Sequence, residues 1–316
     1  MHAQHRDHGG GIDAAAQTYG GDRADWIDLS TGINPLPYDL PELSAQDWAA
    51  LPDTGAQDAL AAAARRFWAV PQTADLLATS GASAPIAMIP HLRPPGTVAI
   101  PAPTYNEHAA AFRAAGWHIH DTPTVGAQAQ VAVHPNNPDG KLTGASDLTA
   151  PLRIIDESFC DVRPDASLIA HSAQPGTLIL KSFGKFWGLA GLRLGFVIGD
   201  PELVAQLRER LGPWPVAGPA LRIGAAALND PDWAARTRAR LHADAARLDA
   251  LMQTAGALSL GGTTLFRLYE VHDAAAWQDR LARHHIWSRV FPYNPRWLRL
   301  GLPPASGWGR LARALT

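Results

Sequence analysis

Short apolar runs recur through the first two thirds of the chain, and each is followed within a few residues by Gly, Pro, Asn or Ser. Runs of this length are typical of buried strands. Two of the intervening segments, residues 84–91 and 106–115, can form helices. This alternation predicts the α/β class, with a largely parallel sheet covered on both faces. The runs are Leu76–Ser80, Thr97–Ile100, Val131–Val133, Leu152–Ile155, Thr177–Leu180 and Leu194–Ile198.

Beyond about Pro201 the pattern changes to longer amphipathic segments, which predict a smaller α+β domain. We expect an N-terminal arm over residues 1–40, a large domain over residues 41–225 and a small domain over residues 226–316. The longest expected helix, Asp232–Gln253, is interpreted as a structural connection between the lobes with no chemistry of its own. The other expected elements are a strand at Thr263–Leu268, a helix at Ala274–His284, and strands around Ile286–Val290 and Trp297–Leu300.

Composition narrows the class of protein. Of the 316 residues 47% are apolar, which is enough for a packed core, and 27 Lys and Arg against 29 Asp and Glu give a net charge of −2. This balance argues against a nucleic-acid partner. The N-terminus lacks the apolar core of a signal peptide, and no apolar stretch approaches the roughly 18 residues of a membrane span. The single cysteine, Cys160, cannot form an internal disulfide, so a cytoplasmic location is expected.

Metal chemistry and serine hydrolysis are not expected. Histidines pair as His118 with His120 and His284 with His285, but no acidic residue has the spacing of a His-Glu-x-x-His site. The segment around Ser83 lacks the second glycine of a nucleophile elbow.

Five turns that follow the apolar runs carry polar side chains. In open α/β sheets ligands bind beyond the carboxyl ends of the strands, so these turns are the expected site. They are Ser80–Ser83, Pro101–Tyr105, His134–Gly140, Asp156–Phe159 and Lys181–Lys185.

Lys185 follows a buried run and stands among small and aromatic residues, with Arg193 eight positions on. Desolvation and a neighbouring cation free the amine of a lysine to attack an aldehyde. Lys185 is therefore a candidate for Schiff-base chemistry, against the alternative of a solvated surface residue.

Asp156 ends the run 152–155, where an unpaired buried carboxylate would cost several kcal/mol. A protonated pyridine nitrogen would pair with it, and this pairing makes pyridoxal phosphate an electron sink. The alternative is that Asp156 caps a turn or a helix.

Gly81, Ala82 and Ser83 precede an expected helix, whose N-terminus can bind a cofactor phosphate. A hydroxyl from Ser182 and a guanidinium from Arg193 can add to the same phosphate. The alternative is an ordinary strand-to-helix turn, because neither a P-loop nor a dinucleotide-binding motif is present.

Asn137 precedes a proline, which favours an extended backbone that would aim its amide at a ligand, such as the phenolate oxygen of pyridoxal. Tyr105 can stack on the ring face. Each can equally be an ordinary loop residue.

Together these motifs resemble the fold-type I pyridoxal-phosphate enzymes of the class I and II aminotransferase family. The resemblance covers most of residues 80–200. It implies a large domain with a mostly parallel seven-stranded sheet and a smaller α+β C-terminal domain. It also implies pyridoxal 5'-phosphate as cofactor and a homodimer with the active site at the subunit boundary. The motifs are Pro103–Tyr105, Pro135–Gly140, Asp156–Phe159, Ser182–Lys185 and Gly188–Gly195.

The resemblance also assigns roles around the cofactor. It implies that Lys185 is the Schiff-base lysine, that Asp156 faces the pyridine nitrogen and that Asn137 lies on the phenolate oxygen. It further implies that Ser182 and Arg193 bind the phosphate.

Substrate contacts are expected from both ends of the chain. Arg299 matches the family's carboxylate-binding arginine, and Arg289, His8 and Asn34 are candidates to hold a second anion, a substrate phosphate. The alternatives are surface arginines on edge strands and a frayed N-terminus. The segment Leu51–Asp53 departs from the family, which often has a tyrosine there that reaches the partner's cofactor phosphate.

Within the family, three segments and Phe159 favour members that decarboxylate L-threonine O-3-phosphate to (R)-1-aminopropan-2-yl phosphate for cobalamin synthesis. Members that transaminate histidinol phosphate, or other aminotransferases of the class, are the alternative. A non-catalytic binding module is less favoured, because it has no need of Lys185, Asp156 and Arg193 together. The three segments are His8–Gly10, Asp28–Leu36 and Trp214–Val216.

Overall fold

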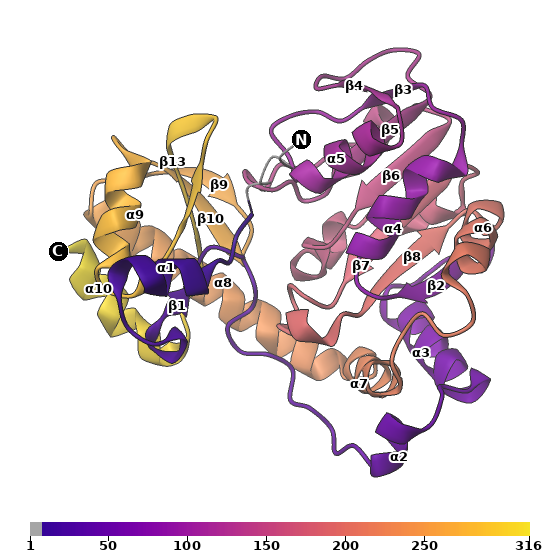
Figure 1. Ribbon diagram of the computed structural model, residues 1–316, viewed down its shortest axis with the longest axis horizontal. Coiled ribbons are helices and arrows are strands. Elements are labelled where there is room, and N and C mark those ends of the chain that lie inside the picture. Colours follow the sequence, from indigo (N-terminus) through magenta and orange to yellow (C-terminus); the bar gives the residue numbers. More distant parts are fainter. Residues whose placement is uncertain (1–7) are drawn as a thin grey trace. The chain divides into compact units, whose positions relative to one another are not determined.

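A seven-stranded sheet forms the centre of the larger of two units in the computed structural model, which describes residues 8–316 (Figure 1). The larger unit comprises residues 37–137 and 141–235, and the smaller one comprises residues 8–36, 138–140 and 236–316. Residues 1–7 of the expected N-terminal arm lie outside the described part of the chain. The structure divides the chain after residues 36 and 235, whereas the sequence predicted boundaries after residues 40 and 225, which stay predictions.

The strand order of the large sheet is β2-β8-β7-β6-β5-β3-β4. The neighbours from β4 to β7 are parallel, whereas β8 runs antiparallel to both β7 and β2, so the expected mostly parallel seven-stranded sheet is confirmed. The strands are β2 (Asp75–Thr79), β3 (Thr97–Ala99), β4 (His118–His120), β5 (Ala129–Val133), β6 (Leu152–Asp156), β7 (Thr177–Ser182) and β8 (Gly195–Gly199).

Each of the six apolar runs overlaps a strand of the large sheet, and β4 is the strand of this sheet that the pattern missed. This strand has three residues at the sheet edge, and its two histidines are exposed, so it carries no apolar run.

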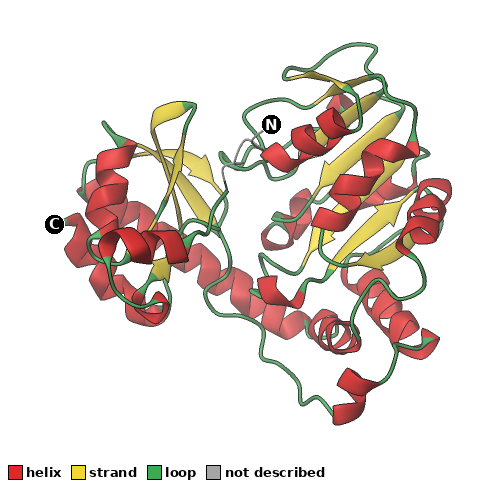
Figure 2. Ribbon diagram, in the orientation of Figure 1, coloured by secondary structure: helices red, strands yellow, loops and turns green. Residues whose placement is uncertain are grey.

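Both faces of the sheet are buried. Successive side chains of a strand point to opposite faces, so neighbouring residues pack in different clusters. Ile154 belongs to a core that includes Ile86, Phe112 and Leu203 from the covering helices. Its neighbour Ile155 packs in a separate cluster on the other side. The helices of this unit (Figure 2) are α2 (Ala45–Ala49), α3 (Thr54–Phe67), α4 (Ser83–Met88), α5 (Asn106–Ala114), α6 (Pro201–Leu211) and α7 (Gly218–Leu228).

The smaller unit holds a four-stranded antiparallel sheet with the order β12-β13-β10-β9. A second, two-stranded pairing joins β1 to β11 in parallel. The elements of the smaller unit are α1 (Ile12–Tyr19), β1 (Ile27–Asp28), β9 (Leu258–Gly262), β10 (Phe266–Glu270), α9 (Ala274–Ala282), β11 (Ile286–Trp287), β12 (Arg289–Phe291), β13 (Asn294–Gly301) and α10 (Trp308–Leu315).

Helix α8 (Pro231–Thr254) matches the long helix expected at Asp232–Gln253. The expected strand Thr263–Leu268 begins later, at Phe266, because residues 263–265 form the turn between β9 and β10, where Thr263 Oγ1 accepts from the Leu265 amide at 3.1 Å. Strand β9 and helix α10 were not expected. No helix in the described residues is long and apolar enough to cross a membrane.

Glycines bring residues 138–140 against the β9–β10 hairpin. The amide of Gly262 donates to the carbonyl of Asp139 at 2.8 Å. Gly140 has φ +74°, and a Cβ there would overlap the carbonyl of Gly262. The contact therefore requires glycine on both sides.

Candidate active site

Asp156 lies at the carboxyl end of β6 and is 2% exposed. One carboxylate oxygen accepts from the amide and the hydroxyl of Ser158, at 3.0 and 2.6 Å, and the other lies 2.9 Å from Nε2 of His108. Burial by itself would raise the pKa of Asp156, but the His108 and Ser158 bonds outweigh burial and hold the pKa below its ordinary value. Asp156 therefore caps its turn and is at the same time a buried anion, two roles that were expected as alternatives.

His108 is a site residue that the sequence reasoning missed. It lies on α5, is 1% exposed, and its ring makes an edge contact with Tyr105, with centroids 6.1 Å apart. The one available signal was its spacing from Tyr105: side chains three residues apart at the start of a helix lie on the same side, so His108 could have been expected near Tyr105. Its contact with Asp156 fixes how that carboxylate is oriented.

Lys185 follows β7 in a loop of aromatic residues. Its Nζ lies 5.1 Å from the centroid of the Phe159 ring, at the end of the turn that begins with Asp156. Phe183 and Trp187 flank it in the chain, are fully buried, and stack with centroids 5.2 Å apart. The amine is therefore carried by a rigid loop and faces the Asp156 turn.

A buried ion-pair network lies beside this loop. Lys181 Nζ is 2.6 Å from Glu157 and 3.5 Å from Asp161. Asp161 also accepts from the indoles of Trp68 and Trp187, at 2.9 and 3.1 Å. Burial alone would lower the pKa of Lys181, but the two carboxylates outweigh it and raise that pKa. The network ties the segment after Asp156 to the loop that carries Lys185.

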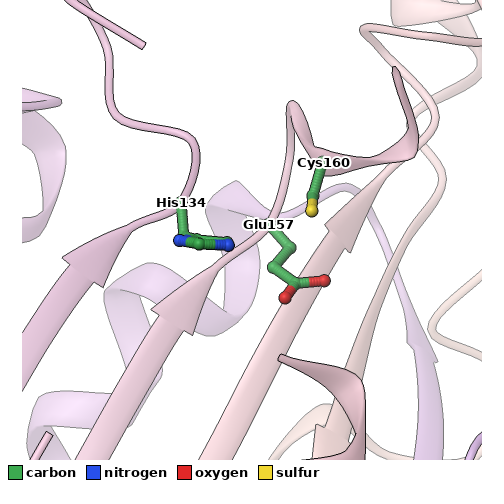
Figure 3. Close-up of side chains that lie close together, drawn as sticks. All are labelled: His134, Glu157 and Cys160. Carbon is green, nitrogen blue, oxygen red and sulfur yellow. The ribbon is translucent and has the colours of Figure 1, made fainter. Parts of the chain in front are cut away.

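His134, Glu157 and Cys160 also meet here, with possible ligand atoms within 4.8 Å of one another (Figure 3). His134 accepts from the Thr143 amide at Nδ1 and donates from Nε2 to the carbonyl of Ala166 at 2.7 Å. Burial and the nearby Glu157 raise the pKa of the Cys160 thiol.

Glu157 is equally engaged in bonds within the protein. Besides Lys181, the hydroxyl of Ser167 and the amide of Leu168 donate to its carboxylate. A metal ion at this cluster would need lone pairs on His134 and Glu157 that other bonds do not use, and a deprotonated Cys160. We therefore assign the cluster of His134, Glu157 and Cys160 a structural role.

The turn at residues 80–83 lies against Arg193. Gly81 has φ +72°, and a Cβ there would overlap the Arg193 guanidinium. A Cβ on Gly195 would likewise overlap the amide nitrogen of Ala82. Arg193 itself has φ +53°, a strained conformation for a residue other than glycine, and such strain clusters at functional sites. The structure thus brings the expected phosphate-binding turn and Arg193 together.

The serines expected near the cofactor phosphate do not contact Arg193 in the bonds that follow. Helix α4 begins at Ser83, whose side chain is exposed, and Ala82 is its N-cap. The hydroxyl of Ser80 donates to the carbonyl of Pro215. Ser182 Oγ, at the end of β7, accepts from the Gly184 amide at 3.2 Å.

Asn136 positions the loops that carry Tyr105 and Asn137. Its amide oxygen accepts from the hydroxyl of Thr104 at 2.6 Å, and its amide nitrogen donates to the carbonyl of Pro103 at 3.0 Å. These bonds hold the residue before Tyr105 against the residue before Asn137. Sequence reasoning singled out Asn137 and missed this partner, because the contact joins residues about thirty positions apart.

Arg289 and Arg299 lie directly opposite each other on β12 and β13 of the smaller unit. Arg299 is 4% exposed, and its guanidinium lies 5.1 Å from the centroid of the Phe266 ring. It donates to the carbonyl of Ser30, while Arg289 donates to the carbonyl of His8 at 2.6 Å. The strand register places two arginines at directly opposed positions, and guanidinium groups bind carboxylates and phosphates well, so this pair suits an anionic ligand.

The N-terminal segment is held in place next to these arginines. The amide of Gly10 donates to Ser30 Oγ at 2.6 Å, and the Trp287 indole donates to the carbonyl of Gly10 at 2.9 Å. A Cβ on Gly9 would overlap the carbonyl of Ser30. From residue 8 onward, therefore, the segment is bonded to the body of the smaller unit.

The expected residues thus divide between the two units. The larger unit contains the candidates for the cofactor: Gly81, Ala82, Ser83, Tyr105, Asn137, Asp156, Ser182, Lys185 and Arg193. The smaller unit contains the candidates for the substrate: His8, Asn34, Arg289 and Arg299.

Comparisons with known proteins identify the family of the chain. The model of the family "Aminotransferase class I and II" matches residues 24–315. A threonine-phosphate decarboxylase from Sinorhizobium sp is 41% identical over 325 residues, covering 98% of this chain and 97% of that protein. A threonine-phosphate decarboxylase from Pseudomonas aeruginosa is 38% identical over 326 residues, with the same coverage of 98% and 97%.

Solved structures show the same fold. The histidinol-phosphate aminotransferase from Sinorhizobium meliloti, solved in complex with pyridoxal-5'-phosphate, superposes with a TM-score of 0.81 at 20% identity. The match covers 97% of this chain and 93% of that one. At this identity the likeness establishes the architecture, which is the fold-type I architecture expected from the motifs.

Proposed function

The chain belongs to the class I and II aminotransferase family, and from this premise we propose that it is a pyridoxal-phosphate lyase that decarboxylates L-threonine O-3-phosphate. The product is (R)-1-aminopropan-2-yl phosphate, for the nucleotide loop of cobalamin. The observation that carries the proposal is the near full-length similarity to two threonine-phosphate decarboxylases. In the reaction the bond from Cα to the carboxylate breaks, carbon dioxide leaves and a proton takes its place.

The residues of the larger unit fit pyridoxal 5'-phosphate. When bound, this cofactor supplies a cationic ring that accepts the electron pair of the broken bond. Lys185 would hold it covalently, and the buried carboxylate of Asp156, oriented by His108, would keep the ring nitrogen protonated. Gly81 provides a cradle that a Cβ would fill, and Arg193 beside it would bind the phosphate.

The other large-unit candidates complete the cofactor's surroundings. Tyr105 would stack on the ring, Asn137 would donate to its phenolate oxygen, and Ser182 would donate to the phosphate. The amides of Ala82 and Ser83 would add to the phosphate contacts.

The paired arginines of the smaller unit suit a substrate with two anionic groups. Arg299 would bind the carboxylate, the group whose bond to Cα breaks. Arg289, His8 and Asn34 would bind the phosphate, a dianion that favours guanidinium and amide donors. Two adjacent cations explain why a phosphorylated amino acid would be preferred to threonine itself.

Large apolar side chains support assembly into a homodimer. Leu40, Trp48 and Leu51 are 62, 71 and 68% exposed within one short stretch, and Trp214 is 54% exposed. Exposed groups of this kind mark interaction surfaces, and the occupant we propose is a second copy of the chain in the cytoplasm. The segment Leu51–Asp53, which departs from the family pattern, leads into helix α3, and Asp53 caps that helix by accepting from the Thr54 amide at 2.7 Å. Sedimentation at micromolar concentration should give twice the mass of the chain; a monomer would contradict the proposal.

Product analysis tests the activity. Purified protein loaded with pyridoxal 5'-phosphate is incubated with L-threonine O-3-phosphate, and carbon dioxide and the amine phosphate should appear in equal amounts. L-threonine without the phosphate is the control substrate, and Lys185→Ala is the control protein. A keto acid formed only with an amino-group acceptor, and no carbon dioxide, would instead identify an aminotransferase.

A further inference from the structure

Asn34 is held by an arginine from helix α8, the helix that the sequence assigned no chemistry. The side chain of Asn34 is 2% exposed. Its amide oxygen accepts from Nη2 of Arg240 at 2.7 Å and from the backbone amide of Leu36 at 3.1 Å. We propose that Arg240 is a positioning residue that aims the amide N–H groups of Asn34 at the substrate phosphate, an inference that rests on the proposed function.

Arg240 is itself held in place along the helix. Its Nη1 lies 3.3 Å from a carboxylate oxygen of Asp244, one turn further on. Side chains four residues apart meet on one face of a helix, so Asp244 restricts the rotamers of Arg240. At 30% and 23% side-chain exposure this pair is partly shielded from water. The order of contacts is therefore Asp244 to Arg240 to Asn34.

This arrangement decides which end of the amide can meet a ligand. An asparagine offers an acceptor oxygen at one end and two N–H donors at the other. Two donors already occupy the oxygen, so a flipped amide would set its N–H groups against a cation and an N–H. The end turned away from Arg240 is the donor end. A guanidinium on the oxygen also polarises the amide and strengthens its N–H groups as donors.

A donor end fixed in this way selects an acceptor-only ligand. A phosphate dianion accepts hydrogen bonds and gives none, whereas an ammonium or a hydroxyl would need the oxygen that Arg240 occupies. Asn34 would therefore contribute to the recognition of the substrate phosphate, and Arg240 would act through Asn34 without touching the substrate.

Arg240→Met tests the proposal in the holoenzyme, with Arg236→Met as matched control. Arg236 lies one turn earlier on α8 and is exposed. Loss of a hydrogen bond to a charged group weakens binding roughly tenfold or more. In Arg240→Met we expect the KM for threonine phosphate, and the inhibition constant of inorganic phosphate, to rise about tenfold while kcat stays within about twofold. Arg236→Met should match the wild type.

A double-mutant cycle with Asn34→Ala separates positioning from a general structural role. If Arg240 acts through Asn34, the double variant should bind phosphate no more weakly than Asn34→Ala alone. Effects on the two residues that add independently, or a fall in kcat with an unchanged KM, would overturn the proposal. Asp244→Asn, which keeps Arg240, should raise the KM by a smaller factor of about two to three, and it serves if Arg240→Met does not fold.

The same cycle remains decisive if the proposed reaction fails. Protection of the holoenzyme against thermal unfolding by inorganic phosphate measures anion binding without turnover. A wild-type protein that releases no carbon dioxide but loses phosphate protection in Arg240→Met would refute the proposed substrate and retain the positioning role. Equal phosphate protection in the wild type and in Arg240→Met would refute the positioning role alone.

Discussion

Replacement of Asp156 by asparagine should remove activity while leaving the fold nearly intact. In the wild type, Ser158 donates twice to one carboxylate oxygen and His108 lies 2.9 Å from the other. An asparagine oxygen can keep both Ser158 bonds, and its NH2 can take the place of the second carboxylate oxygen beside His108. The three charged hydrogen bonds become neutral ones, which costs about 1 kcal/mol of folding stability each, and part of this loss is offset because a charge is no longer buried.

The effect on the reaction should be much larger. Removal of one partner from a buried ion pair costs about 3–5 kcal/mol, which corresponds to roughly 10²- to 10⁴-fold in rate. The cofactor should be partly retained, because the residues proposed to bind its phosphate and to form its covalent link are other ones. The assay compares the rate of carbon dioxide release, the bound cofactor and the melting temperature with those of Asp165→Asn, an exposed carboxylate that serves as control. Turnover within about threefold of wild type at full cofactor loading would refute the ring-nitrogen role.

The same variant has a predictable pH dependence of stability. The pKa of Asp156 lies below its ordinary value in the folded protein, so the carboxylate stabilises the fold above the unfolded pKa of about 3.9. This stabilisation is lost as the pH falls from there through the folded pKa, at up to about 1.4 kcal/mol per pH unit. The stability gap between wild type and Asp156→Asn, measured by urea unfolding, should therefore shrink between pH 5 and pH 3. A gap that is constant or widens would show that the pKa is not lowered.

Three other variants test the remaining contacts. Lys185→Ala should lose the visible absorbance and the borohydride-fixed cofactor after denaturation, and Lys185→Arg should not restore them, because only an amine forms the reducible link; a persistent band would contradict this. Arg299→Lys keeps the charge but loses the two-pronged donor, so turnover with threonine phosphate should fall by about tenfold or more and some keto acid should form; wild-type kinetics would exclude the carboxylate role. Gly81→Ala places a Cβ on Arg193 and should weaken cofactor binding about tenfold, measured by titration, whereas Gly126→Ala, at a similar positive φ but with open space around it, should not; equal effects would point to backbone strain alone.

The local sequence was sufficient for the parallel part of the large sheet and for the main cofactor candidates. Buried strands read as apolar runs, and the turns after them carry chemistry at their carboxyl ends, so Asp156 and Lys185 could be placed at one edge from the sequence alone. Helix α8 could be placed from its amphipathic pattern to within about a residue at each end. Strand β4 had no apolar run, since an exposed edge strand needs none.

Contacts between distant segments were decided only by the tertiary structure. His108 reaches Asp156 across 48 positions, and Arg240 reaches Asn34 across 206. A histidine or arginine on a helix carries no local mark of its partner, because the partner depends on which elements pack together. The pairing of Arg289 with Arg299 depends on strand register, which turn geometry and burial fix together. The sequence therefore determined which groups are candidates for the chemistry, and packing determined which groups orient them.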